Sequence, residues 1–276
     1  MTLARGMWPI AALAMLLAAC SAAAPRTAPP SVSSTPAPTV DLAHGPERID
    51  GRATLNPPPQ PSIVPANRAD LVIDHCVDRD LSAPSVTNVA MVVLDRSYAL
   101  PADYAPTDLV AASTAGANVA SGTELVRAAL VDDLTDMVGA WDAAGLTITI
   151  ESGYRSYAAQ AATFDRWVAR LGPVAALSRA ARPGHSEHQL GTAVDLTSPG
   201  WSGRFGDWAV ESAEGSWMAA HGWEYGFVMS YPAGSEDATC FSYEPWHYRW
   251  IGREAADAHR DSGLDLRRFL ERYVGT

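Results

Sequence analysis

Ser186-Glu187-His188-Gln189-Leu190-Gly191-Thr192-Ala193-Val194-Asp195, followed about fifty residues later by Glu244-Pro245-Trp246-His247-Tyr248, is the part of this sequence that decides its fold. Gly191 allows the backbone to turn after His188. The residues that follow alternate as a short strand, with Val194 and Leu196 on one face. Asp195 therefore points to the other face, where the small Ala193 leaves room beside the carboxylate.

The second stretch predicts another strand. Pro245 disfavours a helical conformation at Glu244 and favours an extended one. In the range 246–250, aromatic residues alternate with polar ones. His247 is therefore expected to face away from the bulky aromatic side chains.

His188, Asp195 and His247 together offer two imidazoles and one carboxylate. This set of ligands predicts a zinc site whose fourth tetrahedral position is open to water. Glu244, three residues before a ligand, is placed to accept the proton of that water. A histidine considered alone would more often be an ordinary hydrogen-bonded residue, but four such positions in this spacing favour a metal site.

The two stretches resemble the VanY-type D-alanyl-D-alanine carboxypeptidases, zinc peptidases of the bacterial wall that are related to VanX-type dipeptidases. The resemblance covers roughly residues 88–255 and further includes Leu100-Pro101, Tyr104–Val110, Ser152–Ser156, Gln160 and Arg182–Ser186. It implies a Hedgehog/DD-peptidase-like zinc peptidase domain. The interleaved helix and strand patterns independently favour an α+β fold with a small, mainly antiparallel sheet flanked by helices.

The resemblance also implies roles for individual residues. Zinc would be held by His188, Asp195 and His247, with Glu244 as general base and Arg155 as an active-site cation. Arg155 would either stabilise the oxyanion or grip the terminal carboxylate of the substrate, and the sequence leaves both roles open. The residues expected to contact the substrate are Tyr154, Gln160, Ser186 and His185.

Two residues beside the ligand His188 have further interpretations. His185, three residues earlier, either supports the metal site, contacts the substrate or has a plain surface role. Glu187, immediately before His188, is expected to be solvated.

The implied reaction is the zinc-dependent removal of the terminal D-alanine from peptidoglycan stem peptides. An L,D-carboxypeptidase or a D,D-dipeptidase of the same family is an alternative. A catalytically silent, zinc-containing wall-binding lipoprotein is another, although a purely structural zinc site would not need the base Glu244. The sequence is compatible with a penta-, a tetra- or a dipeptide substrate.

The amino terminus predicts export. Residues 1–19 have the features of a signal peptide, with Arg5 before an apolar run too short to span a bilayer. Leu17-Ala18-Ala19-Cys20 resembles a bacterial lipobox, which predicts a lipidated Cys20 that anchors the chain outside the cytoplasm on the cell membrane. A simple secretory signal is the alternative. Residues 20–66 are rich in Pro, Ala, Ser and Thr, which predicts a disordered linker, and residues 67–276 are expected to form the peptidase domain.

Once Cys20 is set aside, Cys76 and Cys240 remain as a pair in an oxidising compartment, which predicts a disulfide. The formal net charge of −11 makes nucleic acid an unfavourable partner. The expected partners are the stem peptides and the membrane, and the domain is expected to be a monomer.

Local patterns predict further elements. Thr123 is expected to cap a helix with the apolar stripe Leu130, Leu134, Met137, Val138 and Trp141, and Ser156 to cap another. The remaining predictions are a strand at 146–150, a short helix near 174–180, a helix around 207–220, strands at 227–231 and 246–250, and a polar helical tail.

Overall fold

The computed structural model describes residues 76–85 and 88–274 of the chain. The signal peptide, the lipidated Cys20 and the linker, all predicted within residues 1–66, lie outside the described residues. Within the described part, no helix is long and apolar enough to cross a membrane.

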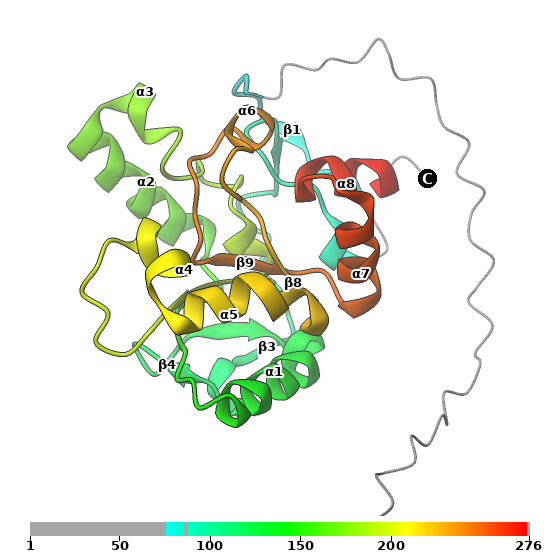
Figure 1. Cartoon of the computed structure of the whole chain (residues 1–276). Helices are drawn as coiled ribbons and strands as arrows, with labels where there is room; N and C mark the ends of the chain where they lie inside the picture. The colour runs from blue at the N-terminus through cyan, green and yellow to red at the C-terminus, as the bar shows by residue number, and fades with distance from the viewer. Residues whose placement is uncertain (1–75, 86–87, 275–276) are drawn as a thin grey trace, which may run out of the picture. The chain divides into compact units, whose positions relative to one another are not determined.

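A five-stranded sheet with the order β4-β6-β7-β9-β8 is the main sheet of the domain (Figure 1). β4 and β6 are parallel, whereas all other neighbours in it are antiparallel. Helices surround this sheet, and the predicted α+β fold with a small, mainly antiparallel sheet is confirmed. The strands are β4 (Asn118–Val119), β6 (Thr149–Ser152), β7 (Ala193–Thr197), β8 (Phe227–Met229) and β9 (His247–Trp250).

Two short strand pairs and the helices complete the described fold. The pairs are β1 (Leu81–Ser82) parallel to β2 (Tyr98–Ala99), and β3 (Leu109–Ala111) antiparallel to β5 (Leu125–Arg127). The helices are α1 (Val131–Ala143), α2 (Tyr157–Leu171), α3 (Pro173–Ala176), α4 (Trp208–Glu211), α5 (Ala213–His221), α6 (Glu236–Thr239), α7 (Arg253–Ser262) and α8 (Leu266–Val274).

Helix α1 packs on one face of the main sheet through the predicted apolar stripe. The buried cluster joins Leu130, Leu134, Met137, Val138 and Trp141 to Val194, Leu196 and Tyr248 of strands β7 and β9. Because side chains alternate along a strand, Asp195 and His247 must project from the opposite face. The apolar core on one side of the sheet therefore determines where the polar residues point.

The predicted start of this helix at Thr123 is wrong. The chain first forms β5, which pairs with β3, and α1 begins only at Val131 after a 3-10 turn over Ala128–Leu130. The pairing places Val126 in the core, where it is fully buried. A tertiary contact thus overrides the local helix signal.

The helix predicted around 207–220 is divided in two. Ser212 ends α4 and begins α5, where its Oγ accepts a hydrogen bond from the backbone N–H of Gly215 at 2.9 Å. Strand β6 begins at Thr149, three residues later than the predicted strand at 146–150.

Helices α7 and α8 pack against the edge of the sheet formed by β8 and hold the beginning of the described domain. Leu266 and Leu270 of α8 are buried in one cluster with Val93. The buried Arg267 of α8 pairs with the buried Asp95 at 2.7 Å. The predicted polar tail is therefore amphipathic, and its buried side joins the two ends of the domain.

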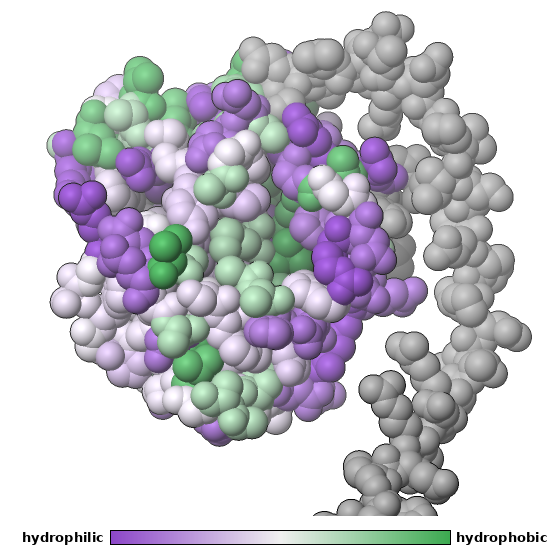
Figure 2. All heavy atoms as spheres, in the orientation of Figure 1, coloured by the Kyte–Doolittle hydropathy of each residue, from purple (hydrophilic) through white to green (hydrophobic). Residues whose placement is uncertain are grey.

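Helix α2 is attached to the domain mainly through its first turns. Ser156 caps it as predicted, with its Oγ accepting from the N–H of Ala159 at 3.2 Å, and Gln160 is the buried residue of the helix. Farther along, apolar side chains are exposed, and Figure 2 shows hydrophobic surface over α2 and α3. Leu171 is 41% exposed and Val174 83%. The anchored end of α2 is the end next to Arg155.

Cys76 and Cys240 form a disulfide, as predicted, with Cα atoms 5.3 Å apart and a sequence separation of 164 residues. The bridge connects the beginning of the described domain to the segment that precedes Glu244. It therefore restrains the chain close to the predicted base and the third predicted ligand.

Removing this bridge is expected to lower stability without abolishing the fold. For a loop of this length, the loss of chain entropy in the unfolded state stabilises the folded domain by about 5 kcal/mol at most. The double variant Cys76→Ser/Cys240→Ser should therefore unfold at lower denaturant concentration than the oxidised parent. Reductant should shift the parent toward the variant and leave the variant unchanged. Equal midpoints for the oxidised parent and the variant would contradict this role.

Candidate metal centre

Strands β7 and β9 place two of the predicted ligands directly opposite one another. Asp195 of β7 and His247 of β9 are register partners in the antiparallel pair. Asp195 Oδ1 lies 2.9 Å from His247 Nδ1. Ser152 of β6 is the partner of Asp195 on its other side, beyond an irregularity in the strand. The three residues thus form a row across the sheet.

The third predicted ligand comes from the turn before β7. His188 belongs to a 3-10 helix over Glu187–Leu190, which ends at Gly191 with φ +75°. A Cβ atom at Gly191 would also approach the side chains of Arg127 and Leu109 to 3.0 and 3.1 Å. Glycine is therefore favoured by both the backbone conformation and the lack of space.

A backbone carbonyl fixes the His188 ring. Its Nδ1 lies 2.7 Å from the carbonyl oxygen of Gly153, which can only accept a hydrogen bond. Nδ1 therefore carries the proton, and Nε2 presents its lone pair toward Asp195 Oδ2, 3.1 Å away.

The donor atoms of His188, Asp195 and His247 all lie within 4.8 Å of one another, and these residues are a group that could hold a metal ion. Tetrahedral coordination with bonds of about 2.0–2.1 Å separates neighbouring ligand atoms by about 3.4 Å. Two imidazole nitrogens and one carboxylate oxygen are a donor set that suits zinc. The residues therefore fit a zinc ion in spacing and in chemistry.

The charges around these ligands favour a bound cation. Burial lowers the pKa of His188 and so keeps the ring neutral, as a ligand must be. Against the effect of burial, the two histidines hold the pKa of Asp195 well below its usual range. Burial by itself would lower the pKa of His247, but hydrogen bonds to Asp195 and Glu187 raise this pKa to about 10. The carboxylates thus stabilise positive charge between the rings, which a divalent cation supplies.

Glu244 lies next to this cluster. Its backbone N–H donates to the carbonyl of Tyr231 at 3.0 Å, and its own carbonyl accepts from the N–H of His247 at 3.1 Å. Burial raises the pKa of its carboxyl group to about 8. The charge of His247 opposes this rise, and that of Asp195 adds to it. The carboxyl group of Glu244 is thus within electrostatic reach of the metal ligands.

Arg155 is held at the side of the cluster by three contacts. Its guanidinium donates to Ser152 Oγ at 2.8 Å and to Gln160 Oε1 at 2.9 Å, and it lies 3.6 Å from Asp195 Oδ2. The amide nitrogen of Gln160 donates in turn to the carbonyl of Ala181 at 2.6 Å. Both polar atoms of this side chain therefore have protein partners, and in the structure Gln160 orients Arg155.

The other three residues predicted to contact substrate, Tyr154, Ser186 and His185, have different environments in the structure. Tyr154 is half-buried beside Arg155, and burial raises its pKa. Ser186 is buried immediately before the 3-10 helix. His185 is buried, with Nδ1 2.7 Å from the carbonyl of Asp95 and Nε2 3.1 Å from Asp80 Oδ1. It connects the metal-binding turn to the beginning of the domain, so a plain surface role is wrong.

Glu187 is the residue whose environment was predicted incorrectly. Its side chain is not solvated but only 5% exposed. Its carboxylate contacts His247 Nε2 at 3.0 Å, Ser230 Oγ at 2.6 Å and Arg249 Nη1 at 2.8 Å. Strict alternation along β9 places Arg249 on the same face as His247, which was the available sequence signal for a buried acidic partner.

Comparisons with known proteins agree with this site. Residues 123–253 match the VanY family, described as D-alanyl-D-alanine carboxypeptidase. The chain is 34% identical to YodJ of Bacillus subtilis (strain 168) over 183 residues, which are 66% of this chain and 67% of that protein.

Two solved structures are similar to the domain. One is the LdcB LD-carboxypeptidase, with a TM-score of 0.59 and 34% identity, covering 65% of this chain and 84% of that one. The other is a mutant of the vancomycin-resistance D,D-pentapeptidase VanY from a VanB-type cassette, in complex with Zn(II). Its TM-score is 0.56 with 30% identity, covering 66% of this chain and 99% of that one. With the ligand cluster and the fold, these similarities show that the chain belongs to the VanY family of D-alanyl-D-alanine carboxypeptidases, which are zinc peptidases.

Proposed function

We propose that this chain is a zinc-dependent D,D-carboxypeptidase that removes the terminal D-alanine from peptidoglycan stem peptides. The observation that carries the proposal is the cluster of His188, Asp195 and His247, whose donor atoms lie within 4.8 Å of one another in a domain of the VanY family. Glu244 and Arg155 beside the cluster supply the two further groups that peptide hydrolysis requires.

The metal ligands, Glu244 and Arg155 have different roles in the proposed reaction. His188, Asp195 and His247 would hold the zinc ion, which would supply Lewis-acid chemistry by lowering the pKa of a water molecule and polarising the scissile carbonyl. Glu244 takes up the proton of the attacking water and returns it to the departing amine nitrogen. Arg155 supplies a fixed positive charge, either for the developing oxyanion or for the terminal carboxylate of the peptide. Ser152 and Gln160 hold its guanidinium in place.

An L,D-carboxypeptidase is the second candidate, because the LdcB structure is as similar to this domain as the VanY structure is. The two activities differ in the residue before the scissile bond and therefore in peptide length. A D,D-dipeptidase would accept the free dipeptide.

Incubation of the zinc-loaded protein with defined stem peptides distinguishes these activities. A pentapeptide ending in D-Ala-D-Ala should lose one alanine, as measured by mass spectrometry, whereas the tetrapeptide and the D-Ala-D-Ala dipeptide should be cleaved much more slowly. Amidation of the terminal carboxylate should slow cleavage if Arg155 grips that group. Preferred cleavage of the tetrapeptide would replace the proposal with the L,D-carboxypeptidase, and preferred cleavage of the dipeptide with the dipeptidase.

We also propose that the mature protein works outside the cytoplasm as a monomer, anchored to the cell membrane by a lipid on Cys20. The sequence Leu17-Ala18-Ala19-Cys20 supports this proposal, and so does a disulfide in the described domain, because such bridges persist in oxidising compartments. The linker over residues 20–66 would let the enzyme reach the wall above the membrane.

Processing at Cys20 is open to a direct test. The mature protein from membranes should begin with a lipid-modified Cys20 in its amino-terminal mass spectrum, and Cys20→Ala should remain unprocessed or leave the membrane fraction. An unmodified amino terminus elsewhere in residues 20–66 would exclude the lipid anchor and favour a protein that is simply secreted.

A further inference from the structure

The buried carboxylate of Glu187 contacts the side of the His247 ring opposite Asp195. His247 Nδ1 faces Asp195 Oδ1 at 2.9 Å, whereas Nε2 faces Glu187 Oε2 at 3.0 Å. Glu187 Oε2 also accepts from Ser230 Oγ at 2.6 Å, and Oε1 accepts from Arg249 Nη1 at 2.8 Å. One carboxylate therefore joins a metal ligand to two other buried side chains.

Arg249 extends this connection to the beginning of the domain. Its side chain is fully buried, and Nη2 donates to the carbonyls of Ala90 and Val92 at 2.9 and 2.6 Å. An unpaired charge at this depth would be unfavourable, so the guanidinium and the Glu187 carboxylate each require the other. The position of Glu187 is thereby fixed from two directions, by its own 3-10 helix and by the anchored arginine.

The two histidine ligands differ in how their second ring nitrogen is held. His188 donates from Nδ1 to the neutral carbonyl of Gly153, whereas His247 meets the carboxylate of Glu187 at Nε2. Both nitrogens of His247 face a carboxylate, and a neutral ring that gives Nδ1 to a metal ion keeps its single proton on Nε2, where Glu187 accepts it. Nδ1 then presents its lone pair beside Asp195, where the ion binds.

We propose that Glu187 is a positioning residue of the metal centre, which fixes the tautomer and orientation of His247 and strengthens its donation to zinc. A carboxylate behind a metal-binding histidine raises the basicity of the ring, and removing such a partner typically weakens metal binding about 10- to 100-fold. The inference rests on the metal site and not on which peptide is cleaved.

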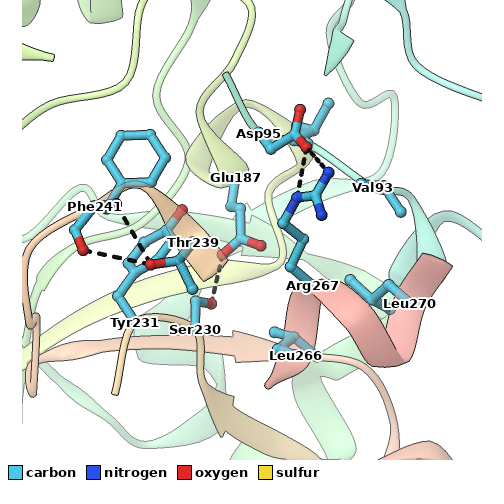
Figure 3. A pocket seen from close by; sticks show the side chains of 11 residues that line it. Val93, Asp95, Glu187, Ser230, Tyr231, Thr239, Phe241, Leu266, Arg267 and Leu270 are labelled. Carbon is cyan, nitrogen blue, oxygen red and sulfur yellow. Dashed lines mark hydrogen bonds and ion pairs between the residues drawn. The ribbon is translucent and has the colours of Figure 1, made fainter. Parts of the chain in front are cut away.

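The surroundings of Glu187 agree with a role through His247 rather than a contact with substrate. Figure 3 shows Glu187 and Ser230 at the wall of a pocket that the Asp95–Arg267 pair also lines. The pocket has a volume of about 10 Å³, which is enough for about one water molecule and too small for a peptide.

The test measures zinc alone. Metal-free Glu187→Gln, nearly isosteric but uncharged, should compete with a chromogenic chelator for zinc about 10- to 100-fold less effectively than the parent. Glu254→Gln, at an exposed glutamate in the first turn of α7, is the matched control and should bind zinc like the parent. Melting of the metal-free proteins separates a loss of fold from a loss of affinity. A less stable Glu187→Gln protein with unchanged zinc affinity would overturn the proposal and leave Glu187 a purely structural role.

A second measurement needs no variant. In the zinc-loaded parent protein, nitrogen-15 NMR of the histidine side chains should show His247 bound to zinc through Nδ1 and protonated at Nε2. Zinc bound through Nε2 would overturn the proposal even if Glu187→Gln failed to fold. Because neither measurement contains a peptide, both remain valid if the proposed substrate is wrong.

Discussion

Glu244→Gln should retain zinc and lose about 10²- to 10⁴-fold in turnover of a D-Ala-D-Ala-terminated peptide, the usual contribution of general acid–base catalysis. Glutamine has almost the shape of glutamate but cannot take up the proton of the attacking water. The ligand atoms of His188, Asp195 and His247 are unchanged by the substitution. Zinc content by elemental analysis and initial rates should be measured on the same preparation.

Glu236→Gln provides the matched control for this variant. Glu236 is exposed on α6, in the same segment between β8 and β9, and its substitution should leave both zinc and rate unchanged. If Glu244→Gln loses zinc, Glu244 is a ligand and not the base. If it keeps zinc and the parental rate, another group accepts the proton.

His188→Ala should abolish both stable zinc binding and activity. The substitution removes one of the three protein ligands together with the ring that is held by Gly153, and two remaining ligands form a much weaker site. After dialysis, elemental analysis should find about one zinc per chain in the parent and almost none in the variant, whose rate should equal that of chelated parent.

His221→Ala is the control for His188→Ala, since the His221 side chain is 46% exposed and pairs with Glu224. It should keep zinc and rate. Full zinc occupancy with parental activity in His188→Ala would show that the metal is bound elsewhere.

The two strands of the site were predictable because a period of two is a strong signal when one face is buried. The core residues Val194 and Tyr248 form a register pair, and the neighbouring pair is Asp195 and His247. One face of each strand had to enter the apolar core, so the other face had to carry the ligands. Knowledge of the register itself came only from the structure.

The burial of Glu187 could not be predicted from the sequence. Within its own turn it stands between polar residues, and no periodic pattern marks it as buried. Its partners Ser230, His247 and Arg249 are 43 to 62 residues away in the sequence. A buried charge of this kind is determined by pairing across the fold, which local propensity does not report. His185 was ambiguous for the same reason, because its contact with Asp95 spans 90 residues.

The beginning of α1 shows the same limit for secondary structure. Its apolar stripe was predicted, since burial of one helix face leaves a regular spacing. Its first turn was not, because the residues after Thr123 pair with β3 instead of forming a helix. The cap at Ser156 was predictable because the hydroxyl bonds to a backbone N–H three residues away.

Titration of the metal-free protein with zinc, followed by the release of D-alanine from a pentapeptide, tests most directly whether this chain is a single-zinc carboxypeptidase. The described residues contain one group of potential metal ligands, formed by His188, Asp195 and His247. Activity should therefore be absent without zinc, rise in proportion to the zinc added and level off at about one ion per chain. Full activity in the metal-free protein, or no release of D-alanine at any zinc concentration, would contradict the account.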